Sequence, residues 1–270
     1  MDPLFALGKL ALTALLVVAA LVYLLQERLI FYPQRLSAAR QAELLARYPA
    51  VRELTLDASD GTRLHGWLHP GTTGAPLVLY FGGNAEEVSW MLEEIPRRMP
   101  QAAWLLTDYR GYGASAGSAS ERTLTADALA WYDYGTRLHS GPVYAFGRSL
   151  GSGVAVALAA SRPLAGLVLV APFDSLVDVG RHYYPFLPVQ RMLRHRFDSA
   201  SLAPAVHAPL LCLVAGSDEV IPLRHSRRLY DAWAGAKRWV ALEGARHNGT
   251  DAAPAFWREV RSFISVERVQ

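Results

Sequence analysis

The stretch Pro142-Val143-Tyr144-Ala145-Phe146-Gly147-Arg148-Ser149-Leu150-Gly151 decides the fold of this chain. It opens with an apolar run of aromatic and β-branched residues, which predicts a buried strand that ends at Gly147. Residues 150–160 are rich in Ala, Val and Leu, which predicts a buried helix. A strand, a sharp turn and a helix, with Ser149 at the turn, match the nucleophile-elbow pattern G-x-S-x-G.

The elbow pattern has a steric reason that makes Ser149 the candidate nucleophile. A strained turn pushes the serine hydroxyl out of the sheet, and side chains two residues to either side would collide there. Gly147 and Gly151 are therefore the expected elbow glycines. The motif alone leaves open an ordinary Gly/Ser-rich turn between a strand and a helix.

The composition predicts a folded protein with one large α/β domain. The chain has 270 residues, of which 51% are hydrophobic and 19% are charged. Its net charge of +3 comes from scattered arginines, so we expect no nucleic-acid partner. The single cysteine, Cys212, lies in an apolar run and is expected to be a core residue.

The N-terminal residues predict attachment to a membrane. Residues 4–25 are almost wholly apolar, and about 20 such residues are long enough to span a bilayer. A signal peptide and a buried helix are the competing interpretations. Because no clear cleavage site precedes Gln26, we expect residues 1–26 to be an uncleaved single-pass anchor, followed by a linker or short helix over residues 27–50.

The distribution of basic residues predicts the orientation of this anchor. Arg28, Arg35 and Arg40 follow the apolar stretch, whereas only Lys9 lies at its N-terminal side. Positive charge favours the cytoplasmic side of a membrane, so we expect the catalytic domain in the cytoplasm.

Residues 51–270 alternate between strand and helix patterns, which predicts a mainly parallel sheet of about eight strands with helices on both faces. Asp60-Gly61 is a strong turn dipeptide and predicts a hairpin between the first two strands. Ser118 and Glu121 are the expected capping box of one helix. The predicted strands are 51–56, 63–68, 76–81, 102–107, 142–147, 164–170, 210–214 and 238–242, and the predicted helices are 85–97, 118–138, 150–160, 223–233 and 252–264.

A serine nucleophile needs a base and a residue that orients the base. In proteins with a nucleophile elbow these residues occur along the chain in the order Ser, acid, His. His247 lies in a loop after a predicted strand, whereas His225 lies on a predicted helix. Asp218 follows the strand that contains Cys212, at the sheet edge where sites of open α/β folds form. Asp174 is a rival acid because it also follows a strand. We expect Asp218 and His247 to complete the triad.

Two backbone N–H groups are the expected oxyanion donors. One belongs to Leu150, directly after the nucleophile, and the other to Asn84, after the strand 76–81. Gly82 and Gly83 allow the backbone to approach a ligand closely. We find no nucleotide-binding motif here and no His/Cys/Asp spacing typical of metal ligands, so we expect neither a cofactor nor a metal.

Short motifs throughout the chain occur in the order of one known family. They are Gln26-Glu27-Arg28-Leu29-Ile30-Phe31-Tyr32-Pro33, Phe81-Gly82-Gly83-Asn84-Ala85, Asp108-Tyr109-Arg110-Gly111-Tyr112-Gly113, the elbow at 147–151, Ala171-Pro172-Phe173 with Ser175-Leu176, Gly216-Ser217-Asp218, and Gly244 with His247-Asn248.

With these motifs the chain resembles the membrane-anchored α/β-hydrolases of the bud-emergence (Bem-like) group. That group is related to α/β-hydrolase-domain depalmitoylases and serine aminopeptidase-like hydrolases. The resemblance implies the α/β-hydrolase fold and hydrolysis of an ester, thioester or amide. The chain departs from the pattern at Gly82, where many relatives have histidine.

Residues 173–207 interrupt the alternation and are expected to form a small cap over the site. The aromatic cluster at 183–188 could line an acyl-binding pocket or pack on the domain's own core. The sequence thus predicts a membrane-anchored serine hydrolase that cleaves acyl esters or thioesters through an acyl-enzyme. A serine peptidase and a non-catalytic membrane adaptor with a hydrolase fold are the alternatives.

Overall fold

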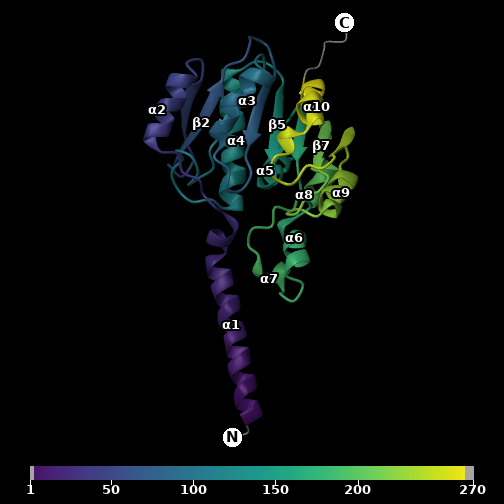
Figure 1. Cartoon of the computed structure of the whole chain (residues 1–270). Coiled ribbons are helices and arrows are strands. Elements are labelled where there is room, and N and C mark those ends of the chain that lie inside the picture. Colours follow the sequence, from purple (N-terminus) through teal and green to yellow (C-terminus); the bar gives the residue numbers. More distant parts are fainter. Residues whose placement is uncertain (1–2, 265–270) are drawn as a thin grey trace.

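The computed structural model describes residues 3–264 of the chain (Figure 1). Residues 1–2 and 265–270, where the predicted anchor begins and the predicted hydrolase domain ends, lie outside the described residues. The strands are β1 (Arg52–Asp57), β2 (Arg63–His69), β3 (Leu77–Phe81), β4 (Ala103–Thr107), β5 (Val143–Arg148), β6 (Gly166–Val170), β7 (Leu210–Ala215) and β8 (Lys237–Leu242). The α-helices are α1 (Pro3–Ile30), α2 (Ala38–Arg47), α3 (Met91–Arg98), α4 (Glu121–Leu138), α5 (Leu150–Ala159), α6 (Leu176–Tyr183), α7 (Val189–Met192), α8 (Ser199–Leu202), α9 (Leu223–Ala232) and α10 (Pro254–Ile264). Short 3₁₀ helices are η1 (Val88–Trp90), η2 (Ala203–Ala205) and η3 (Thr250–Ala252).

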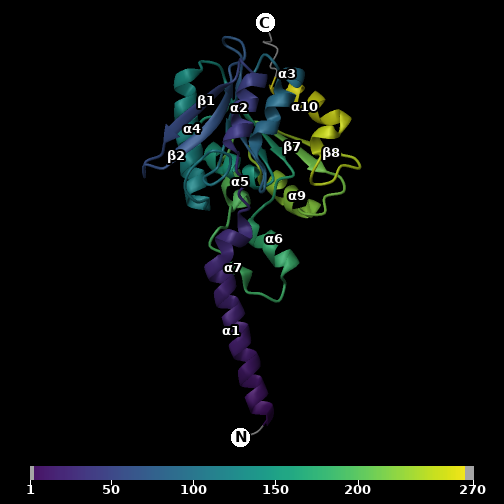
Figure 2. The same ribbon diagram turned by 60° about the vertical axis from the view of Figure 1, so that its left-hand side comes forward.

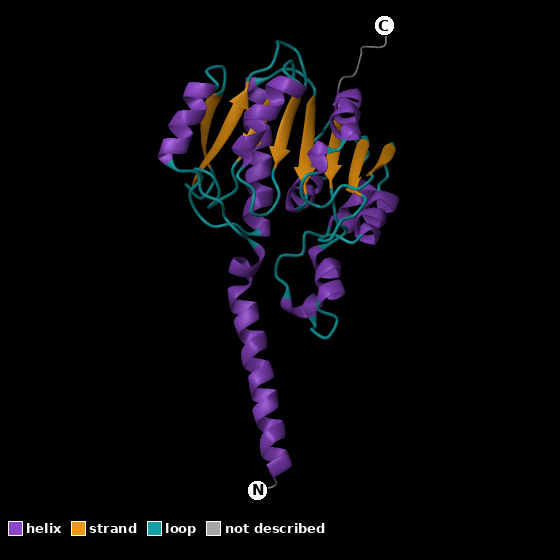
Figure 3. Cartoon of the chain, in the orientation of Figure 1, coloured by secondary structure: helices purple, strands orange, loops and turns teal. Residues whose placement is uncertain are grey.

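The eight strands form one sheet in the order β1-β2-β4-β3-β5-β6-β7-β8. β1 pairs with β2 and β2 with β4 in antiparallel fashion, and all the other pairs are parallel. The predicted mainly parallel sheet is confirmed, as is the hairpin through Asp60-Gly61. In Figure 3 the arrowheads of the parallel strands point toward α1 and the cap, where the cap is defined as residues 173–207.

Helices cover both faces of the sheet (Figures 1 and 2). The strand β3 explains why both faces are buried, because its side chains alternate between two apolar clusters. Leu79 and Phe81 pack in the cluster that also holds residues of α4 and α5. Val78 and Tyr80 pack in the cluster that holds residues of α2, α3 and α10. The core therefore has two layers that hold the strand ends in fixed positions.

The N-terminal helix α1 extends away from the sheet, and α6 and α7 lie beside it in both views (Figures 1 and 2). Within the described residues, no helix combines the length and the apolar character needed to cross a membrane. The predicted transmembrane helix is therefore not found there. The helix also continues past residue 26 and ends at Ile30. Gln26 is not the end of the helix, and its side chain is buried and hydrogen-bonded to the cap. Many apolar side chains of α1 are exposed, namely Leu7, Leu10, Val17, Val18, Leu21, Leu24, Leu25 and Leu29.

The predicted capping box of α4 is wrong. The helix begins at Glu121, and its N-cap is Ser120, which exchanges hydrogen bonds with Thr123. Ser118 lies outside the helix. The Glu121 carboxylate instead accepts the backbone N–H groups of residues 196–197 at 2.6 and 2.8 Å, and so ties the cap to the body of the protein.

The helix predicted at 85–97 also begins later than expected. Ala85 has a φ of 56°, which is not a right-handed helical conformation, so no α-helix can begin at this residue. Regular structure starts with η1 and continues as α3. The residues between Ala85 and η1 remain in a loop, where Glu86 turns back toward β3 and β5.

Candidate active site

Ser149 lies in a strained turn between β5 and α5. Its φ of 49° and ψ of −114° are outside the regions that non-glycine residues favour. A side chain at Gly147 would clash with the backbone of Gly151, and one at Gly151 would clash with the carbonyl of Phe81. The two predicted elbow glycines are thus required by the close packing of the strand ends against α5.

The structure brings together the three residues predicted as a triad. The Nε2 atom of His247 lies 3.0 Å from the Oγ atom of Ser149. Its Nδ1 atom lies 2.9 and 3.0 Å from the two carboxylate oxygens of Asp218. The side chains of His247 and Asp218 are only 8% and 4% exposed, so water hardly competes for these contacts. We call the sheet edge that holds these three residues the serine edge.

Two acids that could rival Asp218 have other partners. Asp174 is 1% exposed and contacts Nδ1 of His225 at 2.8 Å and Arg228 at 3.3 Å. Glu219 accepts the backbone N–H of His247 at 3.2 Å, which is the main reason that its pKa lies below the ordinary value. Only Asp218, of these three carboxylates, reaches the imidazole of His247.

The two predicted oxyanion donors belong to segments next to Ser149: Leu150 follows it directly, and Asn84 follows Gly83, which lies beside it. Leu150 is the first residue of α5, and the first N–H groups of a helix have no acceptor within it. On the other side, a Cβ atom at Gly83 would lie 3.7 Å from the Cβ atom of Ser149, so the loop with Asn84 runs directly beside the serine.

The side chain of Asn84 connects this loop to the end of α1. Its Nδ2 atom donates to the carbonyl of Ile30 at 2.6 Å, and its Oδ1 atom accepts the N–H of Tyr32 at 3.0 Å. The hydroxyl of Tyr112 donates to the same Oδ1 atom at 2.7 Å. The sequence predicted a role for the Asn84 backbone only, and these contacts show that its amide side chain joins distant segments.

Glu86 is a residue near the site that the sequence analysis missed. Its carboxylate accepts hydrogen bonds from the Gly83 backbone at 2.6 Å and from the indole of Trp90 at 2.9 Å. The Tyr80 hydroxyl also donates to it, and Arg148 forms an ion pair with it at 3.2 Å. One buried carboxylate therefore fixes the oxyanion loop and the residue before the nucleophile.

Arg148 extends this arrangement to the loop that carries His247. Its Nη2 atom donates to Asn248, the residue after His247, at 3.3 Å. Burial is the largest single influence on the pKa of Arg148 and lowers it, but Glu86, Tyr80 and Asp251 together outweigh burial and raise this pKa above its ordinary value. The signal in the sequence was a pair of opposite charges, Glu86 and Arg148, each next to a glycine-rich turn.

An apolar cavity of about 490 Å³ lies between α1 and the cap. Its walls include Leu29 and Ile30 of α1 and Leu176, Val179 and Tyr183 of α6. We call it the α1–cap cavity. It lies on the side toward which the parallel strands point in Figure 3.

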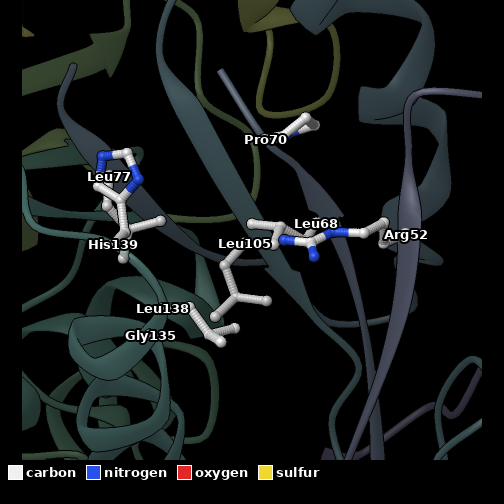
Figure 4. A pocket seen from close by; sticks show the side chains of 8 residues that line it. All are labelled: Arg52, Leu68, Pro70, Leu77, Leu105, Gly135, Leu138 and His139. Atoms are coloured by element: carbon white, nitrogen blue, oxygen red, sulfur yellow. The ribbon is translucent and has the colours of Figure 1, made fainter. Parts of the chain in front are cut away.

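Other hollows lie at the opposite end of the sheet, where the parallel strands begin. The pocket in Figure 4 has a volume of about 40 Å³ and is bordered by Leu77, at the start of β3, and by Leu138 and His139. A wider hollow of about 680 Å³, bordered by Pro76 and Pro142, lies at the same end. Ligands of open α/β sheets bind at the carboxyl ends of the strands, so these hollows are on the wrong side for such a site.

The part of the chain that the structure describes has no group of three or more His, Cys, Asp or Glu side chains placed to hold a metal ion. Cys212 is buried in β7, and burial raises the pKa of its thiol well above the ordinary value. That thiol is therefore a packing group and not a reactive one.

The sheet, the strained serine and its His–Asp neighbours are together typical of an α/β hydrolase. No protein-family model matches the chain. An uncharacterized protein of Mycobacterium tuberculosis is 39% identical over 251 residues, which cover 90% of this chain and 88% of that protein. The α/β-hydrolase domain-containing protein WAV2 of Arabidopsis thaliana is 29% identical, over 91% of this chain and 89% of that protein.

A shorter alignment joins the chain to a lysophosphatidylserine lipase, ABHD12 of Danio rerio, with 35% identity over 60% of this chain and 48% of that protein. Among solved structures, the Pyrococcus furiosus esterase Pf2001 has a TM-score of 0.68 and 14% identity, and covers 87% of this chain and 96% of that chain. At this identity the likeness shows the fold alone. The chain has the α/β-hydrolase fold, and its sequence relatives include proteins named as α/β hydrolases.

Proposed function

We propose that the protein is a serine hydrolase that cleaves acyl esters or thioesters. The observation that carries this proposal is the continuous path from Ser149 through His247 to Asp218, with contacts of 3.0 and 2.9 Å. A serine hydroxyl becomes a nucleophile when a neighbouring base takes its proton. The distances from His247 to Ser149 and Asp218 support the proposal that His247 is this base and that Asp218 orients it.

In the proposed reaction, the Oγ atom of Ser149 attacks the acyl carbonyl while its proton moves to Nε2 of His247. Asp218 accepts the Nδ1–H of His247 and stabilises the imidazolium that forms. Collapse of the tetrahedral intermediate breaks the bond to the leaving group, which takes the proton from His247. Water then attacks the acyl-enzyme with the same base, releases the acid and restores Ser149.

The backbone N–H groups of Leu150 and Asn84 are the proposed donors to the oxyanion. Leu150 directly follows Ser149, and Asn84 directly follows Gly83, which lies beside Ser149. Such donors stabilise negative charge that develops only in the transition state. Loss of one such donor typically lowers turnover by about 10²- to 10³-fold.

The proposed substrate class rests on the surroundings of the serine edge. The α1–cap cavity is apolar, which suits an acyl chain. The zebrafish relative, named as a lysophosphatidylserine lipase, supports the same class of bond.

Fluorophosphonate labelling of the detergent-solubilised, full-length protein tests the nucleophile without a known substrate. We expect wild type to be labelled and Ser149→Ala to be unlabelled. Ser161→Ala, at the exposed end of α5, is the matched control and should keep the label. Equal labelling of wild type and Ser149→Ala would end the proposed mechanism. Acyl esters and thioesters of one chain length then distinguish the two leaving groups.

We further propose that residues 1–26 attach the protein to a lipid bilayer, with 27–50 as linker and 51–270 as a hydrolase domain that carries the cap. The exposed apolar side chains of α1, such as Leu10, Val18 and Leu24, support this division. Arg28, Arg35 and Arg40 favour a cytoplasmic catalytic domain.

Alkaline carbonate washing tests the attachment. We expect the protein to stay in the membrane pellet, and protease added to spheroplasts or intact cells should leave the domain uncut. Release into the supernatant would refute attachment by α1, and digestion from outside would reverse the orientation.

A further inference from the structure

We propose that the α1–cap cavity holds the acyl chain of the substrate, so that the N-terminal helix α1 forms one wall of the substrate site. This inference rests on the proposed function, because it identifies where the acyl part of the cleaved ester or thioester binds. It gives α1 a role in substrate selection besides any role in attachment.

The cavity is formed by two segments that are distant in sequence. Leu29 and Ile30 come from α1, whereas Val179, Leu187 and Leu193 come from the cap. Its volume of about 490 Å³ lies within the range of about 300–1,000 Å³ that ligand pockets occupy. Neither segment alone encloses this space, so the cavity exists only because α1 is docked on the cap.

Two polar side chains of the cavity wall, the buried Gln26 and the half-exposed Tyr183, are already paired. The amide of Gln26 donates to the carbonyls of Tyr23 and Met192, and its oxygen accepts the Arg194 N–H at 2.7 Å. The hydroxyl of Tyr183 donates to carbonyls of the Asp218 loop. A polar ligand group that reached these two side chains would find their hydrogen-bonding atoms already engaged. An alkyl chain has no such groups, and so it is the occupant that fits.

The cavity borders both loops that flank Ser149. On one side, the cavity residues Ile30 and Tyr32 are hydrogen-bonded to the Asn84 side chain, beside the proposed oxyanion donor. On the other side, the Tyr183 hydroxyl contacts the carbonyls of Glu219 and Val220 at 3.2 and 2.9 Å, directly after Asp218. Residues that line the cavity are therefore hydrogen-bonded to both loops, and in this proposal the acyl chain runs from Ser149 between these loops into the cavity.

The far end of the cavity opens among exposed apolar groups. Tyr184 borders it and is exposed, and Phe186 of the cap is 96% exposed. The exposed apolar side chains of α1 continue from the same end, through Leu25 and Leu21. This surface is suited to the tail of a lipid or of a lipidated molecule that is still partly in a bilayer.

Trp substitutions in each wall test the inference with the full-length protein in detergent micelles. Leu29→Trp fills the cavity from α1, and Val179→Trp fills it from α6. Val18→Trp on the exposed face of α1 and Gln190→Trp on the exposed side of α7 are the matched controls, because neither residue lines the cavity. The substrates are the 4-methylumbelliferyl acetate, octanoate and palmitate esters.

In wild type we expect kcat/KM to rise by up to about fourfold per added methylene until the cavity is full. Both filling variants should lower kcat/KM for the palmitate by at least about tenfold, and change that for the acetate by less than about twofold. The two controls should behave as wild type. Folded filling variants that cleave the palmitate as well as wild type does would overturn the inference.

A second measurement needs no substitution and separates this inference from the proposed function. A fluorophosphonate with a long alkyl chain and a terminal diazirine is bound at Ser149 and then irradiated. Cross-links to residues 22–32 and 176–193 are the expected result. Cross-links confined to other segments would overturn the acyl site while leaving the nucleophile intact, and absence of any label at Ser149 would overturn both.

Discussion

The serine edge and the α1–cap side differ in the kind of contact that holds them together. At the serine edge, His247 and Asp218 are buried and make polar contacts of about 3 Å with fixed partners. On the α1–cap side, most of the surface is apolar, and the polar link between α1 and the cap is made mainly by Gln26. Polar contacts of the first kind fix atoms in place, whereas an apolar cavity fixes only a volume.

The difference implies that the serine edge determines the rate of hydrolysis, whereas the α1–cap side determines which acyl chain is accepted. Directional groups at the serine edge act on bonds that change during the reaction. The apolar walls act on a chain that does not react, so they change which ester binds and how well. Substitutions at the serine edge should therefore lower turnover of every ester, and substitutions on the α1–cap side should act on long chains only.

The largest effect is expected for Asp218→Asn, which should lower kcat for all chain lengths by about 10⁴-fold. The amide cannot hold the His247 Nδ1–H in the same way, and the imidazole then favours the wrong tautomer. The measurement is kcat on the acetate and palmitate esters, with the free energy of unfolding measured alongside.

Asp174→Asn is the matched control for this prediction. Asp174 is buried beside His225 and lies outside the Ser149 path, so its loss should cost stability but leave kcat within about threefold. A loss of turnover for Asp174→Asn as large as that for Asp218→Asn would mean that the rival acid takes part in the chemistry.

A smaller but still general loss is expected for Glu86→Gln. The amide removes the negative charge that pairs with Arg148 and weakens the hold on the Gly83 N–H, both next to Ser149. We expect kcat to fall by about 10- to 100-fold for the acetate and the palmitate alike. Glu87→Gln is the neighbouring control, because the Glu87 carboxylate contacts Ser89 and lies outside this network. An effect on long esters alone would place Glu86 with the cavity instead.

The serine edge could be predicted from the sequence because its residues follow local rules. Ser149 requires glycines at fixed spacing, and Asp218 and His247 each follow a strand in a known order. Each of these patterns is read within about ten residues of the chain. The parallel strands then bring the three loops to one edge, so the local patterns are sufficient.

The α1–cap side could not be predicted in the same way. In the sequence, Gln26 is typical of the polar end of an apolar helix, and no neighbouring residue indicates that it accepts a hydrogen bond from Arg194. Glu121 similarly reads as part of a capping box, although it binds the cap at residues 196–197. Contacts between segments more than 70 residues apart leave no periodic or local signal. The cavity volume depends on how these segments pack, which composition does not fix.

Gln26→Ala should separate the two parts of the comparison. It removes the hydrogen bonds to the Met192 carbonyl and from the Arg194 N–H, so α1 loses its main polar hold on the cap. We expect the free energy of unfolding to fall by about 1–3 kcal/mol and kcat/KM for the palmitate to fall about fivefold. Acetate hydrolysis should stay unchanged.

Glu27→Gln is the control for that experiment. The Glu27 carboxylate is exposed and only approaches Arg194 and His195 at 3.6 and 3.7 Å, so its charge should contribute less than about 0.5 kcal/mol. Equal losses in both variants would indicate that charge, and not the buried amide, joins α1 to the cap.

The smallest effect is expected for Tyr183→Phe. This substitution removes the hydroxyl through which the cavity wall is hydrogen-bonded to the Asp218 loop. The loop has its own support, because Oδ1 of Asp218 accepts the N–H groups of Val220 and Ile221 at 2.9 and 2.7 Å. We therefore expect KM for long esters to rise about twofold, with kcat unchanged. Tyr184→Phe, at the exposed rim, should have no effect. A fall in acetate kcat for Tyr183→Phe would mean that the cap positions the acid loop, and that rate and substrate choice are coupled through this hydroxyl.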